Sequence, residues 1–309
     1  MINKAVVTGC SGAVGYGLVK VLVSHGAEVV ILGRSMPELY GINPAKIKFY
    51  KCELSQYAGF TCDETADAFF HLAWSGTYGG GRNDAQLQTK NVDYTLEAVK
   101  LAKRLGCTAF VGTGSQAEYG IVPYGTVLSP SLECKPQTEY GKAKLKACTD
   151  AGLLCKSLGI KFNWCRIISS YGIGDKPHTM VMQTIAKLMS GESCDFTPCD
   201  QIWDYINNED LGEALYLTAK NAAEGRIYVV GSGSPKPLKT YIENIYRAVG
   251  NKNAKCNFGA LDYFENQPMY LCADISDLTH DTGFAPRIPF DVGIARTVEW
   301  YKNLTCKED

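Results

Sequence analysis

The sequence lacks a surplus of either charge. Its 309 residues carry 31 Lys and Arg against 32 Asp and Glu, a formal net charge of -1. Nucleic acid and anionic membranes attract proteins mainly through basic clusters, so neither is expected as a partner. The sequence also lacks a run of eighteen apolar residues and a basic segment followed by an apolar one at its start, so we expect no membrane span and a cytoplasmic protein.

Histidine is scarce, and cysteine is plentiful without the spacing of a metal site. Only four histidines occur, and no two lie at an interval typical of metal ligands. The thirteen cysteines are an odd number, scattered from Cys10 to Cys306, and several lie in apolar runs. Such cysteines are typical of reduced core residues. We therefore expect no metal.

The rest of the composition is that of an ordinary globular protein. A hydrophobic fraction of 46% and a charged fraction of 20% exclude disorder, and the length suits one large α/β domain or a main domain with a smaller partner. The sequence shows no internal repeat, low-complexity tract or clear linker.

The first motif has the order strand, glycine turn, helix. The β-branched run Ala5 to Val7 precedes a turn with glycines at positions 9, 12 and 15, and the amphipathic stretch Tyr16 to His25 follows. One glycine permits the tight turn, one lets backbone approach a pyrophosphate, and one lets the helix pack on the strand. The motif predicts a dinucleotide site made by Gly9, Ser11, Gly12, Ala13, Val14 and Gly15.

The end of the second predicted strand indicates which dinucleotide binds. In an NAD site an acidic side chain at this strand end accepts hydrogen bonds from the ribose hydroxyls. Here the strand Glu28 to Leu32 runs into Gly33, Arg34 and Ser35, and a guanidinium with a hydroxyl suits a 2′-phosphate. The pattern favours NADP, with NAD as the alternative if Arg34 is only a solvated loop residue.

Three further short apolar runs predict strands at Lys46 to Tyr50, Ala68 to Ala73 and Ala109 to Val111. With the first two they predict an α/β, Rossmann-type doubly wound parallel sheet, whose strand ends face the ligand. The residues expected at the cofactor from later strand ends are Glu53, Leu54, Leu72, Ala73 and Ile167. The glycine-rich segment Ser75 to Arg82 suits a lid over substrate or an inert surface loop.

Tyr140 and Lys144 lie four residues apart in a predicted helix, Glu139 to Leu158. Positions i and i+4 share one helix face. A phenol has a pKa of about 10, and a neighbouring ammonium lowers it by favouring the phenolate. The pair therefore predicts an acid/base function, against the alternative of a solvated helix face.

Together these motifs resemble the extended short-chain dehydrogenase/reductases, and more closely the branch that acts on nucleotide-activated sugars. The resemblance covers nearly the whole chain. The segments that carry it are Thr8-Gly-x-x-Gly-x-x-Gly15, His71-Leu72-Ala73, Asn91-Val92, Ser115 with Tyr119-Gly120, Tyr140-x-x-x-Lys144, Arg166 with Tyr171-Gly172, Asp204 with Asp210, Gly283-Phe284-x-Pro286 and Trp300.

The resemblance implies a role for each catalytic position. Tyr140 becomes the acid/base, Lys144 the group that lowers its pKa and holds the nicotinamide ribose, and Ser115 the hydroxyl that bonds the reacting oxygen. Asn91 is implied to help organise a water and the lysine. These roles agree with the chemistry, because a carbonyl that accepts hydride develops negative charge on an oxygen that Ser115 and Tyr140 can both hydrogen-bond.

Two departures from the family carry information. Related 4,6-dehydratases place an acidic pair after the Ser or Thr, where this chain has Gln116 and Ala117, so dehydration is not expected. Many relatives read Gln-x-Arg-Asp before the equivalent of Asp204, with the arginine gripping the diphosphate. Here Trp203 replaces that arginine.

The resemblance also implies a domain organisation. Residues 1–174 are expected to form the NAD(P)-binding Rossmann domain and 175–309 mainly a substrate-binding lobe, with the strand 226–231 returning to the main domain. Predicted helices of the lobe span Thr179 to Ser190, Leu238 to Val249 and Phe290 to Lys302, and another follows Asp210. The residues expected to line the substrate cleft are Trp74, Ser115, Gln116, Tyr171, His178, Trp203 and Arg287.

Three functions follow as hypotheses. The first is an NADPH-dependent reductase of a nucleotide-linked 4-keto-6-deoxyhexose, favoured by Arg34 and Ser35. The second is an NAD-dependent 4-epimerase of nucleotide sugars with the same catalytic residues. The third is a non-catalytic dinucleotide sensor. The set Ser115, Tyr140 and Lys144 argues against it, because a sensor gains nothing from a proton donor beside nicotinamide. The family further implies a homodimer formed through the helices Asp84 to Leu105 and Glu139 to Leu158.

Overall fold

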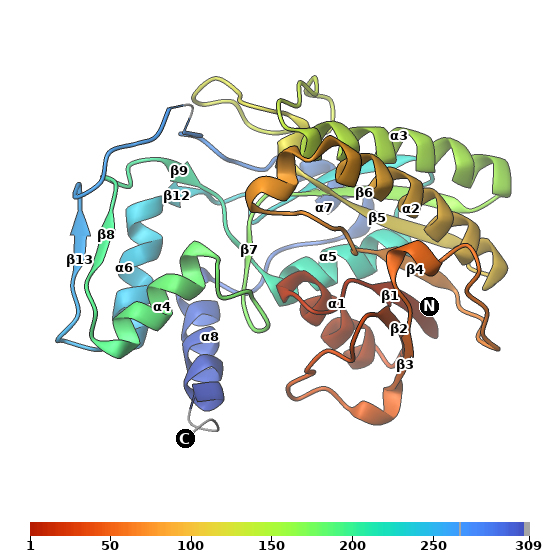
Figure 1. Ribbon diagram of the computed structural model, residues 1–309, viewed down its shortest axis with the longest axis horizontal. Coiled ribbons are helices and arrows are strands. Elements are labelled where there is room, and N and C mark those ends of the chain that lie inside the picture. Colours follow the sequence, from red (N-terminus) through yellow and green to blue (C-terminus); the bar gives the residue numbers. More distant parts are fainter. Residues whose placement is uncertain (266, 306–309) are drawn as a thin grey trace.

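The computed structural model describes residues 1–265 and 267–305. At its centre lies a seven-stranded sheet in the order β11-β6-β5-β4-β1-β2-β3, and all neighbouring strands are parallel (Figure 1). The predicted doubly wound parallel sheet is therefore confirmed. Its strands are β1 (Lys4–Thr8), β2 (Glu28–Gly33), β3 (Ile47–Lys51), β4 (Ala68–His71), β5 (Ala109–Ser115), β6 (Lys161–Ile167) and β11 (Arg226–Val230).

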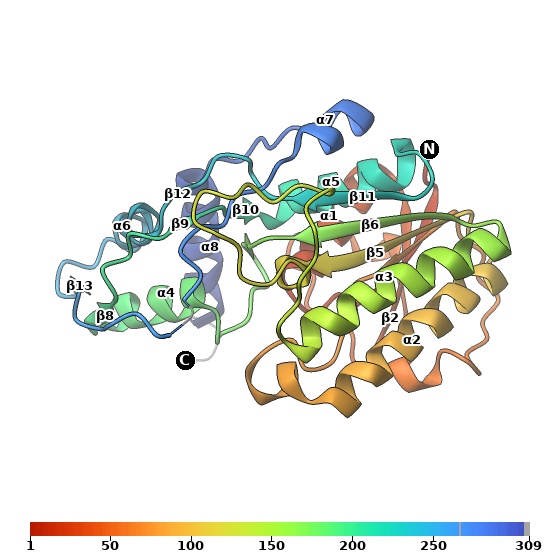
Figure 2. The same ribbon diagram turned by 90° about the horizontal axis from the view of Figure 1, so that it is seen from above.

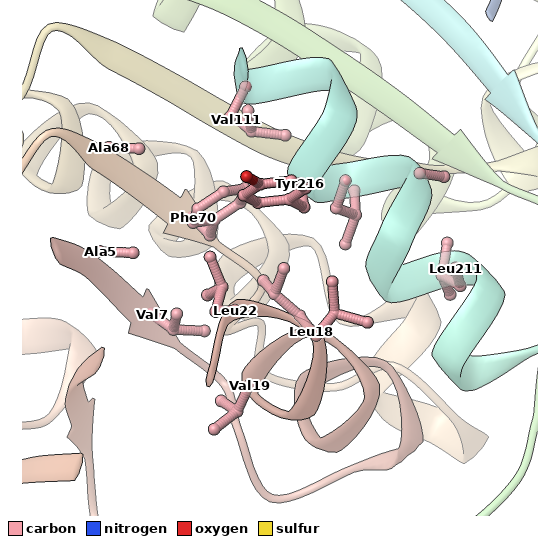
Figure 3. Close-up of a cluster of buried hydrophobic side chains, with 14 of the residues drawn as sticks. Ala5, Val7, Leu18, Val19, Leu22, Ala68, Phe70, Val111, Leu211 and Tyr216 are labelled. Atoms are coloured by element: carbon pink, nitrogen blue, oxygen red, sulfur yellow. The ribbon is translucent and has the colours of Figure 1, made fainter. Parts of the chain in front are cut away.

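Helices cover both faces of this sheet. On one face lie α1 (Ala13–Ser24), α5 (Asn208–Asn221) and α7 (Ser276–Thr282), and on the other α2 (Ala85–Arg104) and α3 (Glu139–Leu158) (Figure 2). Side chains alternate along a strand, so Ala5 and Val7 of β1 pack with Leu18 and Leu211 (Figure 3), whereas Val6 packs toward α2 and α3. Burial of both faces explains the nearly continuous apolar runs of the strands.

Glycines bring α1 and α5 into backbone contact. A Cβ on Gly17 would lie 1.9 Å from the carbonyl oxygen of Asn208, and one on Gly212 would lie 2.5 Å from that of Gly17. The Asn208 amide donates hydrogen bonds to the carbonyls of Ala13 (3.1 Å) and Ile173 (2.8 Å). Helix α5 begins at Asn208, not after Asp210 as predicted. The hydrogen bond to Ala13 ties its first residue to the first turn of α1.

Other segments after β6, apart from α5, β11 and α7, build a smaller lobe beside the sheet (Figure 1). Its aromatic core includes Tyr171, Tyr241 and Phe290. Its elements are β7 (Ser170–Tyr171), α4 (Met180–Ser190), β8 (Cys194–Phe196), β9 (Ile202–Trp203), β10 (Ile206–Asn207), β12 (Lys236–Pro237), α6 (Leu238–Val249), β13 (Cys256–Phe258) and α8 (Phe290–Thr305). Short 3-10 helices elsewhere are η1 (Pro44–Lys46), η2 (Leu54–Gln56), η3 (Gly79–Asn83) and η4 (Gln116–Glu118).

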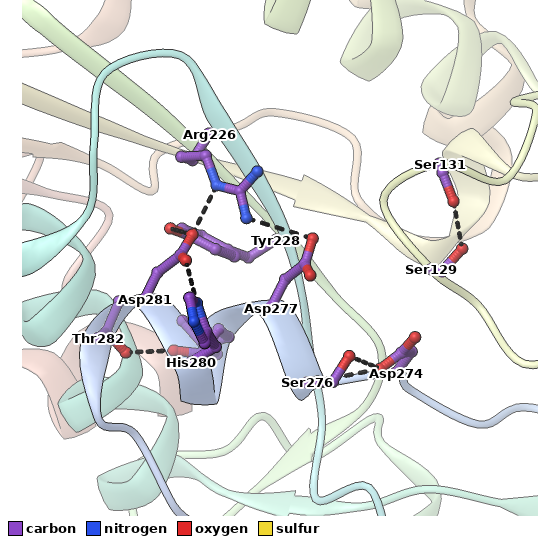
Figure 4. Close-up of polar contacts among 11 residues, drawn as sticks. Ser129, Ser131, Arg226, Tyr228, Asp274, Ser276, Asp277, His280, Asp281 and Thr282 are labelled. Carbon is purple, nitrogen blue, oxygen red and sulfur yellow. Dashed lines mark hydrogen bonds and ion pairs between the residues drawn. The ribbon is translucent and has the colours of Figure 1, made fainter.

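Strand β11 returns from this lobe to the edge of the main sheet, where polar side chains tie α7 to it (Figure 4). Arg226 Nε donates to Asp281 Oδ2 at 2.6 Å, and the Tyr228 hydroxyl donates to the same oxygen at 2.8 Å. Arg226 also pairs with Asp277 at 3.3 Å. Hydrogen bonds from His280, Tyr228 and Arg226 lower the pKa of Asp281 to about 2.

Helix α3 has the bounds that the sequence predicts, Glu139–Leu158. The Thr138 hydroxyl accepts a hydrogen bond from Gly141 N at 3.1 Å, and Gly159 ends the helix with a φ of 66°. Twelve cysteines are free in the described part of the chain, and Cys306 lies outside it. Among the described helices, none has both the length and the apolarity to cross a membrane.

Candidate active site

A cleft opens at the carboxyl ends of the central strands. One part, of about 290 Å³, is lined by Arg34, Ser35, Glu53 and Leu54. The other part, of about 820 Å³, is lined by the glycine turn and by the site residues Leu72, Ala73, Ser115, Tyr140, Lys144, Ile167 and His178. The two parts share Gly9, Ser11, Arg34, Ala73, Trp74 and Ser75, so they form one continuous cleft.

The three glycines of the turn have different surroundings. A Cβ on Gly9, whose φ is +77°, would lie 2.6 Å from Ala73 N, and one on Gly15 would lie 2.4 Å from Cys10 Cα. A Cβ on Gly12 would meet only Lys176 Cε, at 3.9 Å. Gly9 and Gly15 therefore serve close packing, while Gly12 leaves open space in the cleft at the N-terminus of α1. This surface fits the pyrophosphate of a dinucleotide.

Tyr140 and Lys144 both reach the cleft from the buried face of α3, with exposed fractions of 8% and 4%. The ammonium of Lys144 donates to the carbonyl of Thr113 at 2.7 Å and lies 3.7 Å from the ring centroid of Trp74. Burial lowers the pKa of Lys144 to about 7, against the opposing charge of Glu118.

The Tyr140 phenol is surrounded by groups with opposing effects on its pKa. Burial raises the pKa, while a hydrogen bond with Ser115 and the positive charge of Arg82 lower it and Glu118 raises it. The sequence assigned the lowering effect to Lys144, whose ammonium lies 5.9 Å from the Tyr140 ring centroid. The structure adds Arg82 and Ser115 as groups that favour the phenolate.

Glu118 is a central residue that the sequence analysis missed. It is fully buried and accepts hydrogen bonds from Ser115 N (2.9 Å), Trp164 Nε1 (3.1 Å) and Arg166 Nε (2.7 Å). Arg166 in turn donates to the Tyr119 hydroxyl at 3.0 Å. This network holds Ser115 at the end of β5. The pattern Ser-x-x-Glu from 115 to 118 is a capping-box signal that could have revealed it.

Helix α2 shapes the segment 75–82, which borders the cleft. Asn91 Nδ2 donates to Ser75 O at 2.9 Å, and Asn91 Oδ1 accepts from Ser75 N at 3.0 Å. Gln88 donates to the carbonyls of Gly76 (3.0 Å) and Gly81 (2.8 Å). The family resemblance implies that Asn91 helps organise a water and Lys144, and in the structure its side chain holds this loop.

The same segment reaches across the cleft. The Tyr78 ring stacks on the ring of His178 from the smaller lobe, with centroids 3.9 Å apart. The guanidinium carbon of Arg82 lies 4.4 Å from the Tyr140 ring centroid. The segment therefore contacts both the smaller lobe and the ring of Tyr140.

Four residues predicted for the substrate cleft are not among the residues that line it. Tyr171 is fully buried in the smaller lobe, and its hydroxyl donates to Phe290 O at 3.3 Å. Trp203 Nε1 donates to Ser169 Oγ at 2.9 Å, and Trp203 packs in the apolar clusters of the lobe. Gln116 and Arg287 are likewise absent from the lining of the cleft. Aromatic residues after β6 are thus needed for the core of the lobe.

His71 is a buried residue next to Leu72 and Ala73, which line the cleft. Its Nδ1 lies 3.1 Å from the Thr8 hydroxyl, which also accepts hydrogen bonds from Leu72 N and Ala73 N, both at 3.2 Å. Its Nε2 lies 3.3 Å from the Thr95 hydroxyl. Burial and the charge of Lys144 lower the pKa of His71 to about 3, so the ring is neutral. Within residues 1–265 and 267–305, His, Cys, Asp and Glu side chains form no group of three that could hold a metal ion.

Comparison with known proteins agrees with this geometry. Residues 5–231 match the model of the NAD dependent epimerase/dehydratase family. The chain belongs to this family. The resemblance to the extended short-chain dehydrogenase/reductases is thereby confirmed, and the protein is an enzyme of that type.

Relatives span nearly the whole chain of this epimerase/dehydratase family member. A dTDP-6-deoxy-L-talose 4-dehydrogenase (NAD(P)+) of Kitasatospora kifunensis is 26% identical over 92% of this chain and 91% of its own. The UDP-glucose 4-epimerase of Thermotoga maritima, solved with UDP-glucose, has a TM-score of 0.86 at 17% identity, and the match covers 98% of this chain and 99% of the epimerase chain. RMD of Pseudomonas aeruginosa, complexed with NADPH, has a TM-score of 0.82 at 18% identity, and the match covers 98% of this chain and 99% of the RMD chain. These two likenesses show the fold.

Proposed function

We propose that this enzyme is an NADPH-dependent reductase of a nucleotide-linked 4-keto sugar, favoured as a 4-keto-6-deoxyhexose. The observation that carries the proposal is the wall of the cleft at the end of β2, where Arg34 and Ser35 are exposed beside Gly33. A guanidinium and a hydroxyl suit the 2′-phosphate of NADP, and no acidic side chain replaces Gly33 to repel it. An enzyme that performs net reduction exchanges its cofactor with the cellular NADPH pool.

The residues around Tyr140 support reduction at a carbonyl. The bound dinucleotide supplies hydride chemistry. Ser115 and Tyr140 both line the cleft, and the Ser115 side chain is close enough to lower the pKa of Tyr140, so a carbonyl oxygen beside both hydroxyls can receive two donors. Tyr140 then delivers the proton, and Lys144 lies on the same helix face to bind the nicotinamide ribose.

Two further features support the proposed substrate class. The Kitasatospora relative is named as a 4-dehydrogenase of dTDP-6-deoxy-L-talose. In this chain Gln116 and Ala117 follow Ser115, where related 4,6-dehydratases have an acidic pair. Without acids at these positions, the cleft lacks the groups that eliminate water from the sugar in the 4,6-dehydratases. We therefore propose that a 4-keto sugar is the substrate to which hydride is transferred.

The test is the oxidation of NADPH, against NADH, with a freshly generated 4-keto-6-deoxy sugar nucleotide. We expect faster oxidation of NADPH. In Arg34→Gln, the loss of a charged hydrogen bond of about 1.5–3 kcal/mol should reduce kcat/KM for NADPH about ten- to hundredfold and leave NADH unchanged. Lys51→Gln removes an exposed cation at the end of β3 and is the matched control.

Two outcomes would contradict the proposal. Equal use of NADPH and NADH in wild type and Arg34→Gln would refute the proposed binding of the 2′-phosphate by Arg34. Interconversion of 4-hydroxy sugar nucleotides without NADPH consumption, together with NAD retained by the purified protein, would identify a 4-epimerase instead.

We further propose a homodimer formed through α2 and α3. The two helices pack together on one face of the sheet (Figure 2), and Leu153 of α3 is 66% exposed. An apolar side chain on an exposed helix face suits contact with a second copy. Light scattering after size-exclusion chromatography should give the mass of two chains, and the mass of one chain would refute the dimer.

A further inference from the structure

The segment 75–82 places a cation on the residue that the proposed function makes the proton donor. We propose that Arg82 is a positioning residue, a permanent cation that stabilises the phenolate of Tyr140. The inference deepens the proposed function, because it rests on the acid/base role of Tyr140.

The geometry is that of a cation–π contact at a buried ring. The guanidinium carbon of Arg82 lies 4.4 Å from the Tyr140 ring centroid, within the 6 Å limit for such contacts. The Arg82 guanidinium also donates to Thr77 O at 2.9 Å, which fixes it to its own loop. Among residues 1–265 and 267–305, no carboxylate forms a salt bridge with Arg82, so none of them neutralises its charge.

The other charged groups near Tyr140 lie farther from its ring or carry the opposite charge. The ammonium of Lys144, on the same helix, lies 5.9 Å from the Tyr140 ring centroid, against 4.4 Å for the guanidinium carbon of Arg82, and burial lowers the pKa of Lys144. Glu118 of η4 is negative and disfavours the phenolate, although Arg166 of β6 pairs with it.

The remaining neighbours are neutral or lie across the cleft. Ser115 of β5 supplies a hydroxyl. The rings of Trp74 and Tyr140 form a T-shaped pair with centroids 6.1 Å apart. Asp175, Lys176 and His178 line the opposite wall. Arg82 is therefore nearer to the Tyr140 ring centroid than Lys144, and its guanidinium stays charged at every pH of interest.

The chemistry of the reduction explains why this charge matters. The carbonyl carbon receives hydride from the reduced dinucleotide, and the carbonyl oxygen receives the phenolic proton. The O–H bond of Tyr140 breaks, a new O–H bond forms on the sugar, and the electron pair of the broken bond stays on the Tyr140 oxygen. A cation over the ring stabilises this phenolate product, and with it the transition state in which negative charge develops.

The loop that carries Arg82 is held by side chains of α2, through hydrogen bonds of Asn91 to Ser75 and of Gln88 to Gly76 and Gly81. It contains Gly79, Gly80 and Gly81, and a Cβ on Gly79 or Gly80 would meet nothing within 4 Å. Its far end is stacked on His178 through Tyr78. These contacts keep Arg82 over the ring of Tyr140.

The experiment compares pH profiles of kcat in both directions for wild type, Arg82→Gln and Arg82→Lys. Loss of the cation should raise the pKa of Tyr140 by about one unit. In reduction, which needs the phenol, the alkaline limb moves up by about one pH unit. In oxidation of the 4-hydroxy product, which needs the phenolate, the rate below the limb falls about tenfold. Arg82→Lys should lie between wild type and Arg82→Gln.

Two matched variants control for charge and for loop structure. Lys142→Gln removes an exposed cation of α3 close to Tyr140 in sequence, and Asn83→Ala changes an exposed residue beside Arg82. Both should keep the wild-type pH profile. An Arg82→Gln profile that falls equally in both directions at all pH values, with unmoved limbs, would show a merely structural role and overturn the inference.

A second measurement needs no substrate. The ionised fraction of Tyr140 is followed against pH by NMR of protein labelled with 13C-tyrosine, and Tyr140→Phe assigns the resonance. A higher midpoint in Arg82→Gln upholds the role of Arg82 even if no nucleotide sugar is turned over, an outcome that would refute only the proposed function. Equal ionised fractions at every pH would overturn the role of Arg82 even if the reductase activity is found.

Discussion

Replacement of Gly12 by alanine separates cofactor binding from folding. Gly12 is the N-cap of α1, with a φ of -123° that any residue adopts, and an added Cβ would approach only the flexible end of Lys176, at 3.9 Å. The methyl group therefore points into open cleft. It should not disturb the protein, but it occupies the space in which we expect the pyrophosphate.

The magnitudes follow from these surroundings. A methyl group forced into a close-packed contact costs about 1–3 kcal/mol, so the Kd for NADPH should rise about five- to 150-fold. The free energy of unfolding should change by less than about 1 kcal/mol, because the weaker N-cap and the reduced entropy of the unfolded chain oppose each other.

The assay pairs isothermal titration calorimetry of NADPH with urea denaturation. Gly59→Ala is the matched control, since a Cβ there meets nothing within 4 Å and Gly59 is not among the residues that line the cleft. It should change neither quantity by a large amount. Wild-type affinity for NADPH in a folded Gly12→Ala variant would refute the placement of the pyrophosphate against Gly12.

Two other predictions concern the residues around the cleft. Tyr140→Phe should abolish turnover, a loss of at least about a hundredfold, and leave NADPH affinity nearly unchanged because only the proton donor is removed; steady-state rates and calorimetry check this, and near-normal turnover would refute the mechanism. Burial lowers the pKa of His71 to about 3, so below pH 6.5 the unfolded chain binds a proton that the folded chain does not, and stability falls as pH falls. Between pH 7 and 5.5, urea denaturation should show wild type losing about 1 kcal/mol more than His71→Asn, and parallel losses would contradict this.

Local patterns allowed much of the fold to be predicted. The bounds of α3 were correct because Thr138, Gly159 and the helical periodicity between them are all adjacent in sequence. The end of β5 was placed too early, at Val111 instead of Ser115, because the last residues of the strand include glycines that suggest a turn. Those glycines admit the Trp164 ring, which lies 2.3 Å from a Cβ built on Gly112, a contact made by the neighbouring strand.

The sequence by itself determined the order of strand, turn and helix, the glycine turn, and the pairing of Tyr140 with Lys144 on one helix face. Each of these depends on spacing within a few residues, where backbone geometry leaves little choice. It could not determine that Arg82 covers Tyr140, that Glu118 holds Ser115, or that Tyr171 lies in a core, not in the cleft. Those outcomes were decided by tertiary structure, because burial, charge pairing and pKa depend on side chains that only the packing of distant segments brings together.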